Sequence, residues 1–362
     1  MKVLIVFNHP APYKVNLFNL LKKDIDLDVI FERRKASDRP KDFYTNNNYD
    51  FNVTFLKRGA FSKENSNTGE LKRFLKKHHQ DYGLIIMNGY STITEMRAIS
   101  YLRKHNIRFG LYVNGGVIKN DSRLKYKMKK HFISSASYYF SPSIKANEYL
   151  LHYGAKEDSI YNYSYSTVFD KQLLNKPLKK EDKEELRKKL NLPNGRLFIS
   201  ASQFIERKNI LFLLECFKGL EEKLLLIGEG PLKEEYIEYI EENKMDNVIL
   251  KDFMPTNELF QYMKASDFFI TLSKEDIYGH TINESMSNGL PVISSKNVMA
   301  AHRLIKDGVN GYIVDLNEKE DIINKIKAIS SQMSDEALNT ARHFTIEETA
   351  KEHIEIFKKL VK

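Results

Sequence analysis

In the first half of the chain, short continuous apolar runs alternate with segments whose apolar residues recur every three or four positions. The apolar runs are typical of strands buried on both faces of a parallel sheet, and the recurring spacing predicts helices that cover the sheet. Strands are predicted at 2–7, 26–32, 52–57, 83–88, 107–114 and 138–143, and helices near 13–23, 67–79, 92–104, 122–135 and 144–153. The pattern predicts an α/β domain.

The alternation stops after about residue 170, where the chain reads KQLLNKPLKKEDKEELRKKLNLPNGR. Its charge density, two prolines and the pair Asn194-Gly195 indicate a linker that contains one solvent-facing helix. Predicted strands then resume at 196–202, 223–230, 247–253, 267–273, 290–295 and 311–315.

We therefore expect two doubly wound, Rossmann-like domains. The first spans 1–168, a linker spans 169–195, the second domain spans 196–344, and an amphipathic helix spans 345–362. Ligands of doubly wound sheets bind beyond the carboxyl ends of the strands, which predicts a site in a cleft between the domains.

The composition is that of a globular protein. The 362 residues are too many for one ordinary core, and 42% are hydrophobic and 29% charged. No apolar run reaches the roughly 18–20 residues of a bilayer span, and the first run fits a strand better than a signal peptide. The single cysteine, Cys216, excludes an internal disulfide framework and a cysteine-based metal site. We expect a cytoplasmic protein.

The net charge of +9 is unevenly distributed. Residues 1–168 hold 28 Lys and Arg against 15 Asp and Glu, whereas the rest of the chain holds 29 against 33. A basic half joined to a mildly acidic half predicts that the basic half meets an anionic surface. Nucleic acid and an anionic membrane leaflet are the two candidates.

The segment KEDIYGHTINESMSNGLPVIS, at 274–294, carries the strongest candidate chemistry. Asp276 directly follows a predicted strand, and Gly279 permits a tight turn with a close backbone approach to a ligand. A helix that holds Glu284 follows, and the N–H groups of residues 280–282 at its start favour phosphate. Carboxylates accept hydrogen bonds from pairs of hydroxyls. The segment therefore suits a nucleotide sugar, in which ribose, diphosphate and hexose follow one another.

This segment resembles the acidic-x7-Glu signature of the family-4 glycosyltransferases, which are retaining enzymes of the GT-B fold. Four other segments resemble parts of the same family in order and spacing, namely 201–217, 224–236, 248–273 and 304–315. Segments 8–21 and 112–121 resemble members that build capsules and surface polysaccharides. The resemblance also implies that the last helix returns to the first domain.

The resemblance implies donor-site roles for the residues that match these motifs. Lys208 would hold the diphosphate, Glu284 the ribose hydroxyls and Asp276 the transferred sugar, which makes these three the candidate catalytic residues. The other implied donor contacts are Gln203, the backbone of Phe253 and Met254 near the base, and Gly279, His280, Thr281 and Ile282 around the diphosphate. In retaining members the leaving phosphate takes the acceptor's proton, so the resemblance implies no protein nucleophile.

Four departures from the family pattern bear on this interpretation. Asp276 stands in place of the usual Glu, Gln203 in place of an Arg, Met299-Ala300 in place of Gly-Gly, and Asn114 in place of a His. The first two leave open a second function, a non-catalytic GT-B subunit that binds acceptor or nucleotide sugar for a partner transferase.

Several residues after predicted strands of the first domain are candidates for acceptor or cleft contacts. They are Pro12, Tyr13, Lys14, Gly89, Tyr90, Asn114, Gly115 and Gly116, although the prolines of HPAPYK also suit a simple turn. The acidic pattern at 24–28 is one that metal-dependent transferases of another fold use. It precedes a strand, so we interpret it as an exposed strand edge and expect no metal.

The segment SRLKYKMKKHF, at 122–132, has an apolar stripe surrounded by basic residues. One interpretation is a core-facing stripe with a solvated basic face. The other is docking on an anionic membrane surface, which the charge of this half favours. The docking residues would be Arg123, Lys125, Lys127, Lys129 and Lys130.

These observations predict a retaining, metal-independent hexosyltransferase that lies in the cytoplasm or on the inner face of the membrane. It would move a sugar from a nucleotide-diphosphate sugar, a UDP-sugar, to a lipid-linked surface-polysaccharide or glycan acceptor. A nucleic-acid-binding protein and a sugar-nucleotide epimerase of the same fold are weaker alternatives, because no nucleic-acid-binding motif is present and the epimerase rests on fold analogy.

Overall fold

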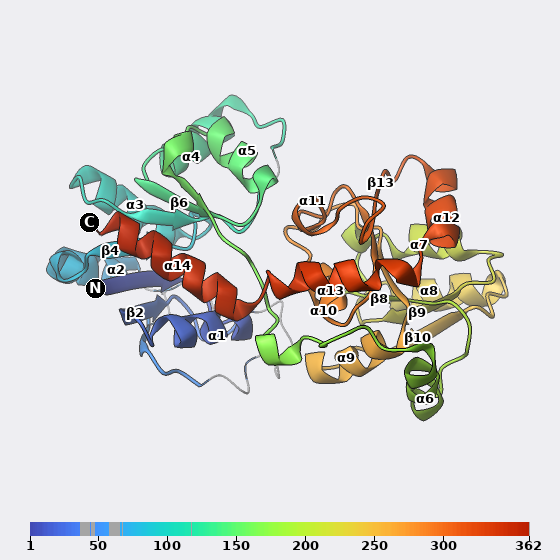
Figure 1. Cartoon of the computed structure of the whole chain (residues 1–362). Coiled ribbons are helices and arrows are strands. Elements are labelled where there is room, and N and C mark those ends of the chain that lie inside the picture. The colour runs from blue at the N-terminus through green and yellow to red at the C-terminus, as the bar shows by residue number, and fades with distance from the viewer. Residues whose placement is uncertain (37–43, 45–47, 58–65, 67, 117, 362) are drawn as a thin grey trace. The chain divides into compact units, whose positions relative to one another are not determined.

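The computed structural model of the chain describes residues 1–36, 44, 48–57, 66, 68–116 and 118–361. The chain forms two compact units, one of residues 1–165 with 346–362 and one of residues 166–345 (Figure 1). Each unit contains a parallel sheet flanked by helices. The fold prediction of two Rossmann-like α/β domains is therefore confirmed.

The sheet of the first unit has the strand order β3-β2-β1-β4-β5-β6-β7. All its neighbouring strands pair in parallel. The strands are β1 (Lys2–Phe7), β2 (Asp26–Phe31), β3 (Asn52–Phe55), β4 (Leu84–Met87), β5 (Gly110–Tyr112), β6 (Tyr138–Ser141) and β7 (Ile160–Asn162). The order reverses between β1 and β4, which places a topological switch point at the carboxyl ends of these two strands.

The helices of the first unit begin at residues that favour helix starts. Pro12 opens α1, Thr92 forms a capping box with Glu95 before α3, and serine side chains cap α4 and α5. These helices are α1 (Pro12–Leu21), α2 (Thr68–His78), α3 (Ile93–Lys104), α4 (Arg123–Ile133) and α5 (Ile144–His152).

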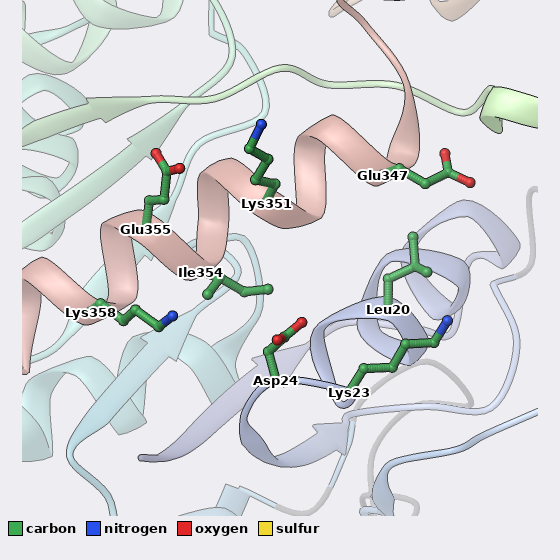
Figure 2. Close-up of a pocket in the computed structure, with 8 residues that line it drawn as sticks. All are labelled: Leu20, Lys23, Asp24, Glu347, Lys351, Ile354, Glu355 and Lys358. Atoms are coloured by element: carbon green, nitrogen blue, oxygen red, sulfur yellow. The ribbon is translucent and has the colours of Figure 1, made fainter.

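The last helix, α14 (Ile346–Leu360), belongs to the first unit and packs against α1 (Figure 1). Its residues Ala350 and Phe357 are buried. The carboxylate of Glu352, on the same helix, accepts hydrogen bonds from the N–H and hydroxyl of Ser164. A surface groove between the two helices carries charges of both signs (Figure 2). It is lined by Leu20, Lys23, Asp24, Glu347, Lys351, Ile354, Glu355 and Lys358.

The sheet of the second unit has the order β10-β9-β8-β11-β12-β13, with every neighbouring pair parallel. The strands are β8 (Leu197–Ala201), β9 (Lys223–Ile227), β10 (Val248–Lys251), β11 (Phe268–Thr271), β12 (Val292–Ser295) and β13 (Gly311–Val314). The helices are α6 (Lys180–Leu190), α7 (Ile210–Phe217), α8 (Lys233–Glu242), α9 (Thr256–Ala265), α10 (His280–Ser287), α11 (Ala301–Leu304), α12 (Lys319–Ala328) and α13 (Ser334–Arg342).

The prediction that the charged helix near residue 185 faces solvent is wrong for one side of α6. Lys183 and Arg187, one turn apart, are buried and both contact the Asp267 carboxylate, at 3.3 Å and 2.8 Å. The Arg187 guanidinium also donates to the carbonyl oxygen of Ala265 at 2.7 Å. The helix therefore docks through charged atoms, which hydrophobic periodicity does not register.

No helix in the described ranges combines the length and the apolar character that crossing a membrane requires.

Candidate functional site

The structure brings Lys208 and Asp276 into direct contact. The Nζ of Lys208 lies 2.5 Å from Oδ2 of Asp276, and their side chains are only 12% and 16% exposed. Lys208 ends a short turn after β8, and Asp276 follows β11, the strand that pairs with β8. Because the carboxyl ends of parallel neighbours meet at one edge of a sheet, two residues 68 positions apart in sequence become partners.

The two loops that carry this pair are joined by further hydrogen bonds. The N–H of Lys274 donates to the carbonyl of Arg207 at 2.9 Å, and the side-chain amide of Asn209 donates to the carbonyl of Leu272 at 3.0 Å. Asn209 has a left-handed backbone, which turns the chain directly after Lys208. The position of Lys208 is therefore fixed from both sides.

The loop after Asp276 also pairs with the segment that follows β12. The N–H groups of Met299 and Ala300 donate to the carbonyls of Asp276 and Tyr278, at 3.3 Å and 2.7 Å. These are the residues that stand in place of the family's Gly-Gly. Their N–H groups are engaged within the protein, where they hold the Asp276 loop in place.

Gly279 is required by the geometry at the start of α10. Its φ of +94° lies in the left-handed region, and a Cβ at this position would lie 2.3 Å from Cγ1 of Val298. Any other residue would therefore be strained in its backbone and would clash with Val298. Gly279 is also the N-cap of α10, so it sets the direction in which the helix starts.

The N–H group of Ile282, one of the three that are predicted to favour a diphosphate, is hydrogen-bonded within the helix. The N–H of Ile282 donates to the carbonyl of Gly279 at 3.1 Å, because the first turn of α10 closes with an i to i+3 hydrogen bond. The contact of Ile282 with a diphosphate stays a prediction. The contacts of His280 and Thr281 with a diphosphate stay predictions.

Glu284 lies in the second turn of α10 and is partly buried. Its Oε1 accepts a hydrogen bond from the hydroxyl of Thr167 at 2.7 Å. Burial raises the pKa of the Glu284 carboxyl, and the hydrogen bond from Thr167 opposes this rise. Thr167 was not predicted, since it lies 117 positions away and no motif marks it.

The remaining predicted donor residues also lie at the carboxyl edge of the second sheet. Gln203 follows β8 and is exposed, and Phe253 and Met254 follow β10. The ring of Phe253 is 63% exposed, whereas Met254 is buried. The sheet order reverses between β8 and β11, so the Lys208–Asp276 pair lies at the switch point of this sheet.

In the first unit, Pro12, Tyr13 and Lys14 form the first turn of α1, which residues 8–11 connect to β1. The Lys14 side chain is 1% exposed, and its amine lies 4.2 Å from the ring centroid of Tyr165 and 5.3 Å from that of Tyr112. Burial lowers the pKa of Lys14 to about 7. The structure therefore encloses the Lys14 amine in aromatic side chains and away from the surface.

The other predicted cleft residues are held by aromatic contacts near α5. The hydroxyl of Tyr90, which follows Gly89, lies 2.5 Å from that of Tyr149, and a Cβ on Gly116 would lie 2.6 Å from the Tyr149 ring. Asn114, two positions before Gly116 and next to Gly115, accepts a hydrogen bond from the Tyr163 hydroxyl at 3.1 Å. Contacts of these residues with an acceptor stay predictions.

The predicted docking residues of α4 are not equivalent. Arg123, Lys125, Lys127 and Lys130 are exposed, whereas Lys129 is bound to Asp121 at 2.8 Å and to the Tyr153 hydroxyl at 3.1 Å. The apolar stripe on this helix is divided. Phe132 is buried, but Leu124 is 80% and Met128 41% exposed, so a fully core-facing stripe is excluded.

Within the part of the chain that the structure describes, no group of three or more His, Cys, Asp or Glu side chains has an arrangement that holds a metal ion. Of the acidic pattern at 24–28, Asp26 pairs with Lys22, and Asp28 accepts hydrogen bonds from Asn52 and Tyr82.

Comparison with known proteins identifies a family model and related sequences. Residues 182–346 match the family model described as "Glycosyl transferases group 1". The alpha-monoglucosyldiacylglycerol synthase of Streptococcus pneumoniae is 29% identical over 208 residues, which cover 55% of this chain and 46% of the relative. The poly(glycerol-phosphate) alpha-glucosyltransferase of Bacillus subtilis is 28% identical over 156 residues, which cover 41% of this chain and 22% of the relative. The chain thus spans less than half of the length of these relatives.

Solved structures share the fold over the whole chain. Anabaena HepE in complex with UDP superposes with a TM-score of 0.78 at 15% identity, covering 99% of this chain and 100% of that one. A glycosyltransferase from Rickettsia africae superposes with a TM-score of 0.76 at 16% identity, covering 100% and 99%. At these identities the similarity establishes the fold, which confirms the predicted GT-B class.

The buried amine of Lys14 predicts a pH-dependent stability. The pKa of Lys14 is about 7 in the folded state and 10.5 for an ordinary lysine, so between these values the unfolded chain binds more protons and stability rises with pH. Relative to wild type, Lys14→Met is expected to be most stabilising at and below about pH 7. The difference in the free energy of unfolding should shrink by up to about 1.4 kcal/mol per pH unit toward pH 10.5.

Urea denaturation from pH 6.5 to 10.5 measures this difference in the free energy of unfolding. Lys23→Met, at an exposed position shortly after α1, is the matched control and should show no such trend. If the free energy of unfolding of Lys14→Met changes with pH in parallel with that of wild type, the lowered pKa of Lys14 is contradicted.

Proposed function

We propose that this chain, which carries a group 1 glycosyl transferase domain at residues 182–346, transfers a sugar from a UDP-sugar to a lipid-linked surface-polysaccharide or glycan acceptor. The observation that carries the proposal is the contact between Lys208 and Asp276 at the switch point of the second sheet, one turn before α10 and Glu284. The loop–helix segment after β11 supplies two carboxylates and a helix start, and the turn after β8 supplies the cation Lys208; together they suit the charges and hydroxyls of a nucleotide sugar.

In the proposed donor complex, the Lys208 ammonium would turn from Asp276 toward the diphosphate. Asp276 would then be free to accept hydrogen bonds from hydroxyls of the transferred sugar, and Glu284 would accept them from the ribose. The exposed ring of Phe253 lies at the same sheet edge and would border the base. Uridine is favoured because the structurally similar HepE was solved with UDP and an Escherichia coli relative is named for UDP-Gal.

We propose that transfer retains the configuration of the anomeric carbon and needs no metal. The family resemblance supports a proton transfer from the acceptor to the leaving phosphate. Lys208 supplies a positive charge where the diphosphate gains negative charge, which is the stabilisation that such a step requires. The anomeric coupling constant of the product, with and without a chelator, distinguishes this course from an inverting or metal-dependent one.

A lipid-linked acceptor is supported by the names of the relatives. One relative is named alpha-monoglucosyldiacylglycerol synthase, and the name of a Campylobacter jejuni relative includes diphospho-undecaprenol. The exposed basic residues of α4 stand beside exposed Leu124 and Met128, a combination that suits an anionic lipid surface. We propose that α4 docks peripherally on such a surface.

The donor site predicts selective loss of binding in two variants. Lys208→Ala removes the phosphate cation and Glu284→Ala the ribose acceptor, so each should weaken binding of the nucleotide sugar at least tenfold, which is about 1.4 kcal/mol. Calorimetry and thermal shift with UDP-, GDP-, ADP- and CMP-sugars measure this, since a hundredfold excess over Kd adds about 2.7 kcal/mol of stability. Lys319→Ala, which breaks a half-exposed pair with Glu215 in the same unit, is the control.

If no nucleotide sugar binds wild type, the donor assignment is wrong and a non-catalytic, acceptor-binding subunit becomes the better interpretation. Donor binding without turnover on any lipid-linked acceptor would favour the same alternative.

The α4 surface predicts binding to anionic vesicles. Each basic residue near such a surface contributes about 1 kcal/mol, so Arg123→Glu combined with Lys127→Glu should abolish flotation with phosphatidylglycerol vesicles at moderate salt. Lys76→Glu combined with Lys104→Glu changes the charge equally at exposed positions on α2 and α3 and should leave flotation intact. Wild type that fails to float, or equal loss in both double variants, would rule out docking through α4.

A further inference from the structure

Helix α10 holds both segments through which the chain passes from one unit to the other. The first crossing follows Tyr165, and the second precedes Ile346. The side-chain amide of Asn283 donates to the hydroxyl of Ser166 at 2.9 Å and to the carbonyl of Phe344 at 2.7 Å. One side chain of α10 therefore bonds to both crossing segments, on the side that belongs to the second unit.

The neighbouring position on the helix bonds to the neighbouring position on the first crossing segment. Thr167 donates to Oε1 of Glu284 at 2.7 Å, directly beside the bond from Asn283 to Ser166. Ser166 is held further, since its hydroxyl accepts from the N–H of Val168 at 3.0 Å. The pairs 166–283 and 167–284 thus run in register, and the crossing segment is fixed to α10 at two successive residues.

Burial makes these hydrogen bonds difficult to break. Asn283 and Ser166 are 1% and 4% exposed, so water does not replace a lost partner. Thr167 and Glu284 are only partly buried, which keeps the carboxylate within reach of a ligand. Among the described residues, Thr167 is the hydrogen-bond donor found for Glu284, and it binds one of the two carboxylate oxygens.

We propose that Thr167 is a positioning residue for donor binding: its hydroxyl holds Oε1 of Glu284 and leaves Oε2 directed to the ribose hydroxyls of the nucleotide sugar. Asn283 keeps Thr167 in place by clamping Ser166. The inference rests on the proposed function, since it takes Glu284 as the ribose-binding group. Burial raises the pKa of Glu284 and so disfavours its ionised form, whereas the hydrogen bond from Thr167 lowers the pKa and favours that form, which is the one that accepts two hydrogen bonds.

The arrangement has a consequence for the crossing segment. Thr167 is the second residue of the second unit after the crossing. A shift of that segment therefore moves the Thr167 hydroxyl away from Glu284. The affinity for the nucleotide sugar and the conformation of residues 166–168 are therefore coupled through one hydrogen bond.

Two substitutions at Thr167 test the role of its hydroxyl. Thr167→Val keeps the shape and removes the hydrogen bond, whereas Thr167→Ser keeps the hydroxyl. The quantity measured is the calorimetric Kd of the full chain for the UDP-sugar, alongside the free energy of unfolding. We expect about tenfold weaker binding for Thr167→Val and a Kd within twofold of wild type for Thr167→Ser.

Thr340→Val is the matched control. Thr340 is also partly buried, lies in the second unit, and hydrogen-bonds to Asn310 and to the carbonyl of Glu336. Thr340→Val should lower the free energy of unfolding as Thr167→Val does, but it should bind the nucleotide sugar with the affinity of wild type. This comparison separates positioning of Glu284 from a general structural role.

Three outcomes would overturn the inference. If Thr167→Val binds the donor as wild type does, the hydroxyl does not position Glu284, although the donor site stands. If Thr167→Ser is as weak as Thr167→Val, the methyl group and its packing are what matter. If wild type binds no nucleotide sugar, the proposed function fails and the inference fails with it.

Discussion

The candidate site depends on the left-handed turn at Gly279. The loop after β11 must place Asp276 against Lys208 and then start α10 within three residues, and Val298 leaves no room for a side chain at the turn. The glycine thus fixes the position of the Asp276 carboxylate, before the helix, relative to the Glu284 carboxylate, within the helix. The roles proposed for Lys208, Asp276 and Glu284 all require this relative position.

Helix α10 combines a packing role with a binding role. Its residues Ile282 and Met286 are fully buried, and the helix packs against α13. Asn283 and Glu284, between those anchors, carry the hydrogen bonds to the crossing segments. Because the apolar residues fix the rotation of the helix about its axis, the two polar side chains face the crossing segments to which they are hydrogen-bonded.

The sequence predicted those strands and helices whose apolar residues follow a regular pattern along the chain. Continuous runs such as VLIVF and LLLI are buried as strands β1 and β9, because parallel strands covered on both faces need no polar positions. Strand β7 was missed because Ile160–Asn162 is three residues long and only partly buried. The docked face of α6 was missed because Arg187 is buried through ion pairs and carbonyl contacts.

The motif residues of the site were predictable from spacing within one segment, but their partners were not. Thr167 reaches Glu284 across 117 positions, and the aromatic surroundings of Lys14 come from Tyr112 and Tyr165, far along the chain. Such contacts depend on which strand ends are neighbours, and that order became known only with the sheet topology.

Hydrogen–deuterium exchange with and without the UDP-sugar tests most directly whether α10 is the centre of the donor site. Exchange slows where a ligand suppresses local opening. The account predicts slower exchange in residues 206–209 and 276–284, together with 166–168, where Thr167 meets Glu284. Binding that protects other segments and leaves the start of α10 unchanged would contradict it.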